Sequence, residues 1–571
     1  MVGQQAFEKH LVREGVVDEE RLPRALAEAE RAGVSLVDAL VQTGLASSDR
    51  VYEALAGFCE LRYVVPSKLD IPADLAQKVP ARFANHYSFV PVQERNGTMV
   101  VAVSDPLNNQ LLDDIRTVLK QRIEPVVATP DEITRALKAL YGIGADTVER
   151  ILGDSEAHGN VVSLDKLAAN ADLGDEKIDA SIIKFVNQLF SEAIRSNATD
   201  IHIEPFEEEL RVRFRIDGVL HGMPVPPSIR GFHSAIVSRV KIMSNLNIAE
   251  KRLPQDGKIR AALGEEQFDL RVSILPTPYG ETVNLRILNR KSMFMTLDQL
   301  GFDQRDLSLF NQFIRRPHGM ILVTGPTGSG KTTTLYAALS KLNNLENKII
   351  TIEDPIEYQL QGITQTQTQQ QIGYTFASAL RAMLRHDPDI MLVGEIRDQE
   401  TAEMAVRSSL TGHLVFSTLH TNDASGAVTR LTDLGLEPFL ISSTMVASIA
   451  QRLMRRVCSD CAEPFEPDDQ QFLDLGIDVK EREGATFRRG RGCDNCRHTG
   501  YRGRMAIYEI LPFTTAIKEL TVERASSDAI KRQARLDGMR TLRESGWQRV
   551  RQGVTTFEEV MRVTADADLG V

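Results

Sequence analysis

The spacing of apolar residues in the first 60 positions is typical of helices. Apolar side chains recur every three to four residues and would line one face of a helix in each of two segments: Leu22, Ala25, Leu26 and Ala29, then Val51, Leu55 and Phe58. The pentapeptide LVREG at residues 11–15 recurs as LVQTG at residues 40–44, an offset of 29 residues. We therefore expect two similar helical hairpins at the start of the chain.

Between residues 63 and 142, strand-like and helix-like runs alternate. Residues 89–92 (FVPV) and 99–103 (MVVAV) are apolar runs typical of strands, and residues 113–120 and 132–140 have helical spacing. We expect a small α/β module here. Together with the hairpins it would form an N-terminal docking domain over residues 1–142, and a ligand-binding role is the alternative.

The next segment, residues 143–177, changes in composition. It is rich in Gly, Asp, Ala and Glu and has only a short apolar patch near residues 161–167. Such a segment buries too little apolar surface to fold alone, so we expect a flexible linker.

Regular patterning returns after the linker. A helical run is followed by alternating apolar and polar positions, which predict strands; the segments are 182–196 for the helix, then 200–204, 210–215, 268–272 and 282–287. We expect an α+β domain over residues 178–290. The remainder, residues 291–571, is predicted to be a large α/β domain.

Length and composition agree with a folded, multidomain protein. The 571 residues suggest roughly three to four domains, and 42% are hydrophobic and 25% charged. The net charge of −11 argues against a general nucleic-acid coat, because such binding depends on neutralising phosphates. We also expect no membrane-spanning helix and no secretory signal, since the sequence has neither a long apolar run nor a basic start followed by an apolar segment.

The most specific motif is GPTGSGKT at residues 325–332. It follows the apolar run MILVT and precedes a helical segment, which is the context of a phosphate-binding loop, or P-loop. The glycines let backbone N–H groups point at phosphate oxygens, and the helix N-terminus adds positive charge. Lys331 would reach the β- and γ-phosphates, and the Thr332 hydroxyl would complete a Mg²⁺ shell. A chance glycine-rich turn is the alternative. The expected nucleotide-binding residues are Gly325, Pro326, Thr327, Gly328, Ser329, Gly330, Lys331, Thr332 and Thr333.

Two further apolar runs end in acidic residues. IMLVGE ends at Glu395, and IITIEDPIE ends at Glu357. The carboxyl ends of parallel strands lie beside a P-loop, so Glu395 is a candidate for organising Mg²⁺, directly or through water. Glu357 is a candidate for polarising the attacking water. The alternative for each is a solvated loop acid.

A third apolar run, residues 414–418, is bracketed by His413 and His420. Two histidines beside a P-loop strand are candidates for sensing the γ-phosphate. A structural role is the alternative for each of them.

Four of the five cysteines form two C-x-x-C pairs: Cys458 with Cys461, and Cys493 with Cys496. Each pair suits a knuckle turn, and two pairs together make a tetrahedral four-thiolate site. Such a site has no open position, so we expect a structural metal, with Zn²⁺ as the default. Four free cysteines or an iron–sulfur cluster are the alternatives. Cys59 stands alone, and its role is open.

Taken together, these motifs resemble the secretion-superfamily ATPases that assemble type II secretion pseudopili and type IV pili (the GspE/PilB-like family). The resemblance covers roughly residues 178–571 and is carried by the P-loop GPTGSGKTTTLYAAL, the cysteine pairs and the closing GMRTLRESGWQRVRQGVTTFEEVMRVT. TIEDPIEY resembles the family's Asp box, LRHDPDIMLVGEIRD its Walker B region, and TGHLVFSTLHTNDA its His box. Upstream, TDIHIEP, RFRIDGVL and RLPQDGKI are also similar.

The resemblance implies a RecA-like ATPase core at residues 291–571, with a zinc subdomain inserted at residues 458–504, preceded by a PAS-like α+β domain. It implies a homo-hexamer that hydrolyses ATP with Mg²⁺ on the cytoplasmic face of the inner membrane, where partners hold it peripherally. Those partners would be an inner-membrane platform protein and a cytoplasmic adaptor domain, with no nucleic acid.

Individual residues also match the family by position in its motifs. Glu357 resembles its catalytic glutamate and Glu395 its Walker B glutamate. Arg271 and Arg286 match arginines of the upstream domain that approach the nucleotide phosphates, which would couple phosphate state to domain closure. Arg381, Arg385 and Arg502 match further family arginines whose roles stay open. Structural ion pairs are the alternative for all five arginines.

Two departures from wider patterns matter. Gly394 stands where many P-loop enzymes carry a second Walker B acid, as it does in this family. Some relatives carry an Arg-Leu-Gly-x-x-Leu repeat linked to a cyclic dinucleotide, but residues 4–11 and 32–40 lack its arginine. We therefore expect the N-terminal domain to dock on an adaptor and not to bind that messenger.

Three other functions compete with pilus or pseudopilus assembly. A retraction ATPase typically lacks both the four-cysteine insertion and the long N-terminal region. A DNA-transfer motor would want a basic channel, which the charge of −11 does not support. A scaffold without hydrolysis conflicts with the intact Lys331, Glu357 and Glu395. Secretion and piliation share these motifs, so the sequence leaves that choice open.

Overall fold

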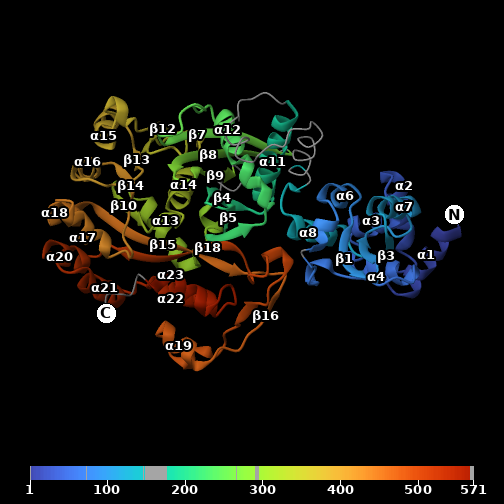
Figure 1. The fold of residues 1–571 in the computed structure, drawn as a ribbon. Helices are drawn as coiled ribbons and strands as arrows, with labels where there is room; N and C mark the ends of the chain where they lie inside the picture. Colours follow the sequence, from blue (N-terminus) through green and yellow to red (C-terminus); the bar gives the residue numbers. More distant parts are fainter. Residues whose placement is uncertain are drawn as a thin grey trace. The chain divides into compact units, whose positions relative to one another are not determined.

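The computed structural model describes residues 2–72, 74–145, 147, 176–264, 266–289 and 295–565. It divides into two compact units, Met1–Leu288 and Asn289–Val571, and each is described by itself (Figure 1). Most of the linker expected at residues 143–177 lies outside the described residues. No helix in the described part of the chain combines the length and apolarity that crossing a membrane requires.

Unit 1 begins with four helices: α1 (Val2–Arg13), α2 (Leu22–Ala32), α3 (Leu36–Gln42) and α4 (Ser48–Phe58). The repeated pentapeptide ends α1 and α3 in the same way. The Val16 N–H donates to the Leu11 carbonyl at 3.0 Å, and the Leu45 N–H donates to the Leu40 carbonyl at 3.1 Å. This turn needs a residue in the left-handed region, which Gly15 (φ 63°) and Gly44 (φ 67°) supply. The sequence repeat is therefore a repeat of helix-ending turns.

A three-stranded sheet follows, with strands in the order β1 (Val90–Arg95), β2 (Thr98–Val103) and β3 (Arg122–Val127). Its core is covered by short helices, namely α5 (Asp74–Lys78), α6 (Ala81–His86), α7 (Asn109–Leu119) and α8 (Pro130–Tyr141). The sequence pattern did not predict β3. Its exposed Arg122 and Glu124, together with Pro125, interrupt the apolar run that marks a strand.

The second part of unit 1 is a six-stranded sheet in the order β6-β5-β4-β9-β8-β7. Its strands are β4 (Ala198–Pro205), β5 (Leu210–Ile216), β6 (Val219–Met223), β7 (Gln255–Leu263), β8 (Glu266–Thr277) and β9 (Gly280–Asn289). Helices α11 (Glu176–Arg195) and α12 (His233–Met243) share one apolar core with the sheet. Strands β6 and β7 and helix α12 were not predicted, because their apolar positions are sparse or irregular.

Unit 2 is built on a seven-stranded sheet in the order β12-β11-β13-β14-β10-β15-β18, parallel except for β18. Its strands are β10 (Gly319–Thr324), β11 (Ile349–Glu353), β12 (Thr364–Gln367), β13 (Ile390–Val393), β14 (Leu414–Leu419), β15 (Met445–Val457) and β18 (Tyr501–Pro512). Four of them, β10, β11, β13 and β14, are buried along their whole length, which explains their largely apolar runs.

Helices form one apolar core on each face of this sheet. On one face lie α13 (Gln304–Ile314) and α14 (Lys331–Leu342). The other core holds α15 (Phe376–Met383), α16 (Gln399–Leu410), α17 (Gly426–Asp433), α18 (Pro438–Thr444), α20 (Thr515–Val522), α21 (Ser527–Leu536), α22 (Leu542–Val550) and α23 (Phe557–Thr564). The α/β fold class and its P-loop topology are as the sequence predicted.

The four-cysteine region is an insertion between β15 and β18. It contains the paired strands β16 (Ala462–Pro464) and β17 (Arg488–Gly490) and helix α19 (Asp469–Leu475). Phe472 of α19 packs against Phe487, Trp547 and Phe557, with ring centroids 5.2–5.9 Å away. The insertion is thus anchored on α22 and α23 by an aromatic cluster.

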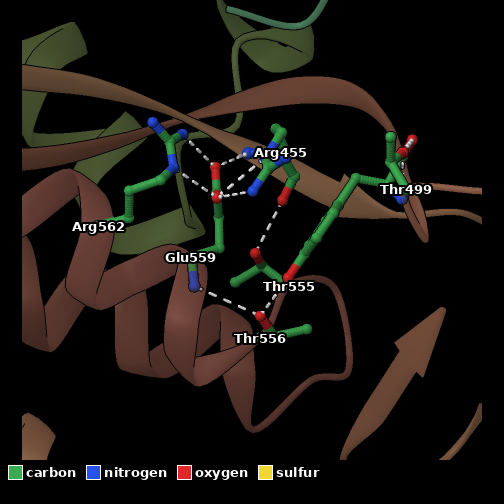
Figure 2. Close-up of polar contacts among 7 residues, drawn as sticks. Arg455, Thr499, Thr555, Thr556, Glu559 and Arg562 are labelled. Carbon is green, nitrogen blue, oxygen red and sulfur yellow. Dashed lines mark hydrogen bonds and ion pairs between the residues drawn. The ribbon is translucent and has the colours of Figure 1, made fainter. Parts of the chain in front are cut away.

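A buried carboxylate joins the last helix to the strand that leads into the insertion (Figure 2). Glu559 of α23 accepts hydrogen bonds from the Arg455 backbone (2.8 Å) and side chain (2.7 Å), and from Arg562 (2.6 Å). The two arginines and the Arg455 backbone amide hold the pKa of Glu559 below its usual range despite its burial. The Arg455 guanidinium also lies 4.1 Å from the ring centre of Tyr501, whose hydroxyl meets Thr556 at 2.7 Å.

Replacing Glu559 with alanine is expected to lower the free energy of unfolding by about 3 kcal/mol at pH 7, because it leaves Arg455 without its carboxylate. The contribution of Glu559 is present above the pKa of an unfolded glutamate, near 4.5, and is lost as the pH falls through its lower folded value. Chemical denaturation of both proteins measures the difference. Glu558→Ala is the matched control: its side chain is exposed on the same helix, and a loss equal to that of Glu559→Ala would contradict the assignment.

Candidate nucleotide site and four-cysteine centre

The P-loop joins the carboxyl end of β10 to the start of α14, with Gly330 as the helix N-cap. Three glycines have positive φ angles: Gly325 (144°), Gly328 (80°) and Gly330 (90°). A Cβ atom at Gly325 would lie 2.6 Å from the Gln451 carbonyl oxygen, and one at Gly330 would lie 2.7 Å from the Gln451 side chain. Only glycine fits these two positions, which keeps the loop backbone open toward an anion.

Ser329 and Lys331 have the surroundings expected of groups that meet phosphate. The Ser329 hydroxyl is buried and has no hydrogen-bond partner among the described residues. Lys331 lies over the loop and donates from Nζ to the carbonyls of Gly325 (2.8 Å) and Pro326 (3.0 Å). Burial lowers the pKa of Lys331 to about 8, the charge of Glu395 acts against this change, and Arg452 adds to it. A phosphate would satisfy the hydroxyl and neutralise the ammonium.

Glu395 follows β13 at the same edge of the sheet. Its Oε2 lies 3.4 Å from His420 Nε2, and its other oxygen pairs with Arg397. The end of β13 is fixed by a 2.8 Å hydrogen bond from Thr418 to the Gly394 carbonyl. The structure thus brings together Lys331, Glu395 and His420.

Gly394 shows why a second acid is missing beside Glu395. A Cβ atom at this position would lie 3.3 Å from the Glu353 Cα and 3.4 Å from the Ile352 carbonyl oxygen. Strands β11 and β13 are adjacent, so a larger residue would push them apart.

Glu357 lies in the segment after β11 and is partly buried. Near it, Glu353 is buried at 4% exposure and accepts hydrogen bonds from Tyr336, Thr351 (2.6 Å) and Gln365 (3.2 Å). Burial and the charge of Glu357 both raise the pKa of Glu353. The carboxylate of Glu353 is therefore held by hydrogen bonds inside the protein and has a structural role. Glu357 is the more accessible carboxylate of the two.

The structure does not bring His413 to the P-loop. His413 precedes β14, and its carbonyl accepts from the N–H of Gly319, the first residue of β10. The P-loop lies at the opposite end of these parallel strands. The His413 ring contacts the Ser408 carbonyl at 2.8 Å and the Thr411 hydroxyl at 3.1 Å. These local contacts favour a structural role for His413, the alternative to sensing the γ-phosphate.

Arg271 and Arg286 lie on strands of unit 1. Arg286 Nε donates to Asp200 Oδ1 at 3.1 Å, across the paired strands β4 and β9. Its two Nη groups make no hydrogen bond to any described residue, and half of the side chain is exposed. Arg271 lies opposite Lys258 on β7. Asp200 thus anchors the Nε of the Arg286 guanidinium.

The three remaining family arginines make local contacts. Arg381 pairs with Glu400 at 2.6 Å, Arg385 donates to the Arg381 carbonyl at 3.0 Å, and Arg502 pairs with Asp460 at 3.1 Å. Both ion pairs are exposed. They correspond to the structural ion pairs that were the alternative role for Arg381 and Arg502.

Sequence reasoning missed two residues beneath the P-loop, Gln451 and Arg452 of β15. Gln451 accepts a hydrogen bond from Thr334 of α14 at 2.8 Å. Arg452 is only 7% exposed and donates to the Asn422 carbonyl at 2.9 Å. A usable signal existed, since a glutamine and an arginine stand inside the otherwise apolar strand sequence MVASIAQRLM.

The two cysteine pairs converge. The sulfur atoms of Cys458, Cys461, Cys493 and Cys496 all lie within 4.8 Å of one another. Three of the sulfur–sulfur distances are 3.7, 3.8 and 3.9 Å. A tetrahedral ion with metal–sulfur bonds of about 2.3 Å has sulfur–sulfur edges of about 3.8 Å, so the four thiols fit a closed metal site. None of these cysteines, nor Cys59, forms a disulfide.

Comparisons with known proteins agree with this geometry. The model of the "Type II/IV secretion system protein" family matches residues 175–562, and the "MshEN domain" model matches residues 59–147. A type IV pilus assembly ATPase PilB from Myxococcus xanthus is 43% identical over 566 residues, which cover 97% of this chain and 98% of the relative. A type II secretion system ATPase E from Vibrio cholerae is 44% identical over 494 residues, covering 86% and 97%.

Among solved structures, the pilus retraction motor PilT with bound ADP is 27% identical, covers 66% of this chain and 96% of that one, and has a TM-score of 0.44. The family match spans most of the chain and includes both the P-loop and the four cysteines. The chain belongs to the type II/IV secretion system protein family.

Proposed function

We propose that this protein is an ATPase that powers assembly of a type II secretion pseudopilus or a type IV pilus. The observation that carries the proposal is the P-loop beside Glu395 and His420, in a chain that matches secretion and pilus-assembly ATPases over nearly its full length. The working form is a homo-hexamer held at the cytoplasmic face of the inner membrane by a platform protein and an adaptor domain.

In this proposal the substrate is ATP, and its phosphates occupy the cradle made by residues 325–332. Lys331 contacts the β- and γ-phosphates, and Ser329 donates its hydroxyl, which has no hydrogen-bond partner in the part of the chain that the structure describes. Thr332 and Glu395 would hold Mg²⁺, which neutralises charge on the phosphates. His420, through its contact with Glu395, lies where it can respond to the γ-phosphate.

Hydrolysis needs a water molecule to attack the γ-phosphorus while the bond to the β–γ bridging oxygen breaks. Glu357 orients this water and accepts its proton. ADP leaves with the bridging oxygen, and the γ-phosphoryl group leaves as inorganic phosphate. Arg271 and Arg286 stabilise the charge that develops on the transferred group when the upstream domain closes.

An allelic replacement tests the cellular role. A strain in which Lys331→Ala replaces the wild-type residue should lose surface pili, or should lose an exported protein from the culture medium, while the variant accumulates to wild-type levels. Which of these two functions the strain loses also distinguishes a role in piliation from a role in secretion. Normal piliation together with normal export would contradict the proposal.

The four cysteines are proposed to hold one Zn²⁺ per chain as a structural ion. Elemental analysis of the purified protein should find about one zinc per chain. Cys493→Ser should lose the metal and increase amide hydrogen exchange locally in residues 458–504, because metal-binding energy is folding energy in such a small insertion. Cys59→Ser is the matched control and should retain the metal. A wild-type protein without zinc, or with iron and sulfide, would refute the assignment.

A further inference from the structure

Arg452 connects two loops of the candidate ATP site that come from distant parts of the sequence. Strand β15 runs parallel to β10, with Ala450 opposite Thr324, the last residue of β10. Strand β15 continues past this point, so its residue Arg452 lies at the level of the P-loop. Its Nη1 donates to the Gln451 carbonyl at 3.1 Å, and a Cβ atom built on Gly325 would lie 3.1 Å from the same nitrogen. The guanidinium therefore packs directly beneath the first residue of the P-loop.

The second contact of Arg452 is with the loop between β14 and α17. Its Nη2 donates to the Asn422 carbonyl at 2.9 Å and approaches the Asn422 side-chain oxygen at 3.4 Å. This loop begins with His420, whose Nε2 lies 3.4 Å from Glu395. One buried cation thus contacts the floor of the P-loop and a residue two positions from His420.

Other contacts also hold this loop, among them an ion pair of Asp423 with Lys531 of α21 at 3.6 Å. Thr324 approaches the Asp423 carbonyl at 3.4 Å, and the Ala424 N–H donates to the buried carboxylate of Glu509 at 2.8 Å. The 2.9 Å Arg452–Asn422 bond links this loop to β15, the strand beneath the P-loop. It is also charge-assisted, which makes it stronger than a bond between neutral groups.

We propose that Arg452 is a positioning residue, which holds residues 420–425 against the P-loop so that His420 stays in contact with Glu395. The proposal rests on the proposed ATP hydrolysis and assigns Arg452 no contact with the substrate. Because the residue acts through His420, its loss should slow the chemical step more than it weakens nucleotide binding. A misplacement of about 1 Å at a reacting group can cost about 10²-fold in rate.

The test compares Arg452→Gln and Arg452→Lys with the wild-type full-length chain. Binding of a fluorescent ADP analogue and single-turnover ATP hydrolysis at saturation are measured for each. Arg452→Gln should lower the single-turnover rate by about 10²-fold and change ADP affinity by less than about threefold. The lysine should recover part of the rate, since an ammonium can reach one of the two carbonyls. Arg456→Gln, an exposed arginine on the same strand, is the matched control and should stay within about twofold of wild type.

A double mutant separates positioning from a general loss of structure. In a His420→Ala background, Arg452→Gln should add little further loss, because both changes remove the same arrangement. Hydrogen exchange of the amides in residues 420–426 should increase in Arg452→Gln and not in Arg456→Gln. This last readout needs no ATP turnover, so it tests the proposal even if the wild type fails to hydrolyse ATP.

Three results would overturn the proposal. The first is an Arg452→Gln variant that hydrolyses ATP at the wild-type rate. The second is a rate loss that adds in full to that of His420→Ala. The third is a fall in ADP affinity as large as the fall in rate, which would make Arg452 an ordinary binding residue.

Discussion

Lys331→Ala is expected to lower ATP turnover by about 10²–10³-fold, the usual effect of removing one preorganised group that stabilises charge in the transition state. The ammonium lies over the P-loop, held by the carbonyls of Gly325 and Pro326, where it can meet the β- and γ-phosphates. Its surroundings exclude much of the solvent, which makes its interaction with phosphate stronger than it would be in water.

Phosphate release at saturating ATP measures this effect, alongside binding of a fluorescent nucleotide. Lys341→Ala is the matched control, because it removes an exposed lysine from the other end of the same helix. The control should retain wild-type turnover. If Lys331→Ala also stays within about twofold of wild type, the P-loop assignment is wrong.

Arg286→Ala is expected to lower the single-turnover rate by about 10³-fold while leaving nucleotide affinity nearly unchanged. The P-loop and Arg286 belong to different units. In the proposed mechanism the guanidinium meets the phosphates only when the upstream domain closes. Asp200 binds its Nε. Its Nη groups have no hydrogen-bond partner among the described residues, and in this mechanism they make a bidentate contact with an anion. A contact that forms mainly along the reaction path affects kcat more than binding.

The effect of Arg286→Ala should also depend on assembly. A dilute, monomeric protein should already be slow and should respond little to the substitution, whereas a concentrated protein should respond fully. Arg195→Ala, which removes an exposed arginine from the end of α11, is the control for loss of surface charge. If the affinity of Arg286→Ala collapses while its rate at saturation is unchanged, Arg286 is a binding residue and domain closure loses its main support.

Local patterns in the sequence were enough to predict the P-loop and four strands of its sheet, β10, β11, β13 and β14. A short, fully buried strand such as β10 is largely apolar, and Gly325 and Gly330 of the loop occupy positions where a Cβ atom would collide with Gln451. The convergence of the cysteine pairs also followed from spacing alone, because each C-x-x-C makes its own turn. Strands β3, β6 and β7 were missed because half-exposed strands with mixed residues carry little local signal.

What the sequence could not supply was the register between distant strands. His413 and His420 flank the same apolar run, but only the carboxyl end of a parallel strand meets the P-loop, so the structure places only His420 there. Arg452 is far from the P-loop along the chain and reaches it only through the pairing of β15 with β10. The ion pair of Asp200 with Arg286 depends in the same way on the pairing of β4 with β9.

The most direct test of the account is phosphate release by the purified wild-type chain in the presence of ATP, with and without Mg²⁺, over a range of protein concentrations. The account predicts turnover that requires Mg²⁺ and whose rate per chain rises with protein concentration as the subunits assemble. A protein that binds ATP but releases no phosphate at any concentration, with Mg²⁺ present, would contradict it.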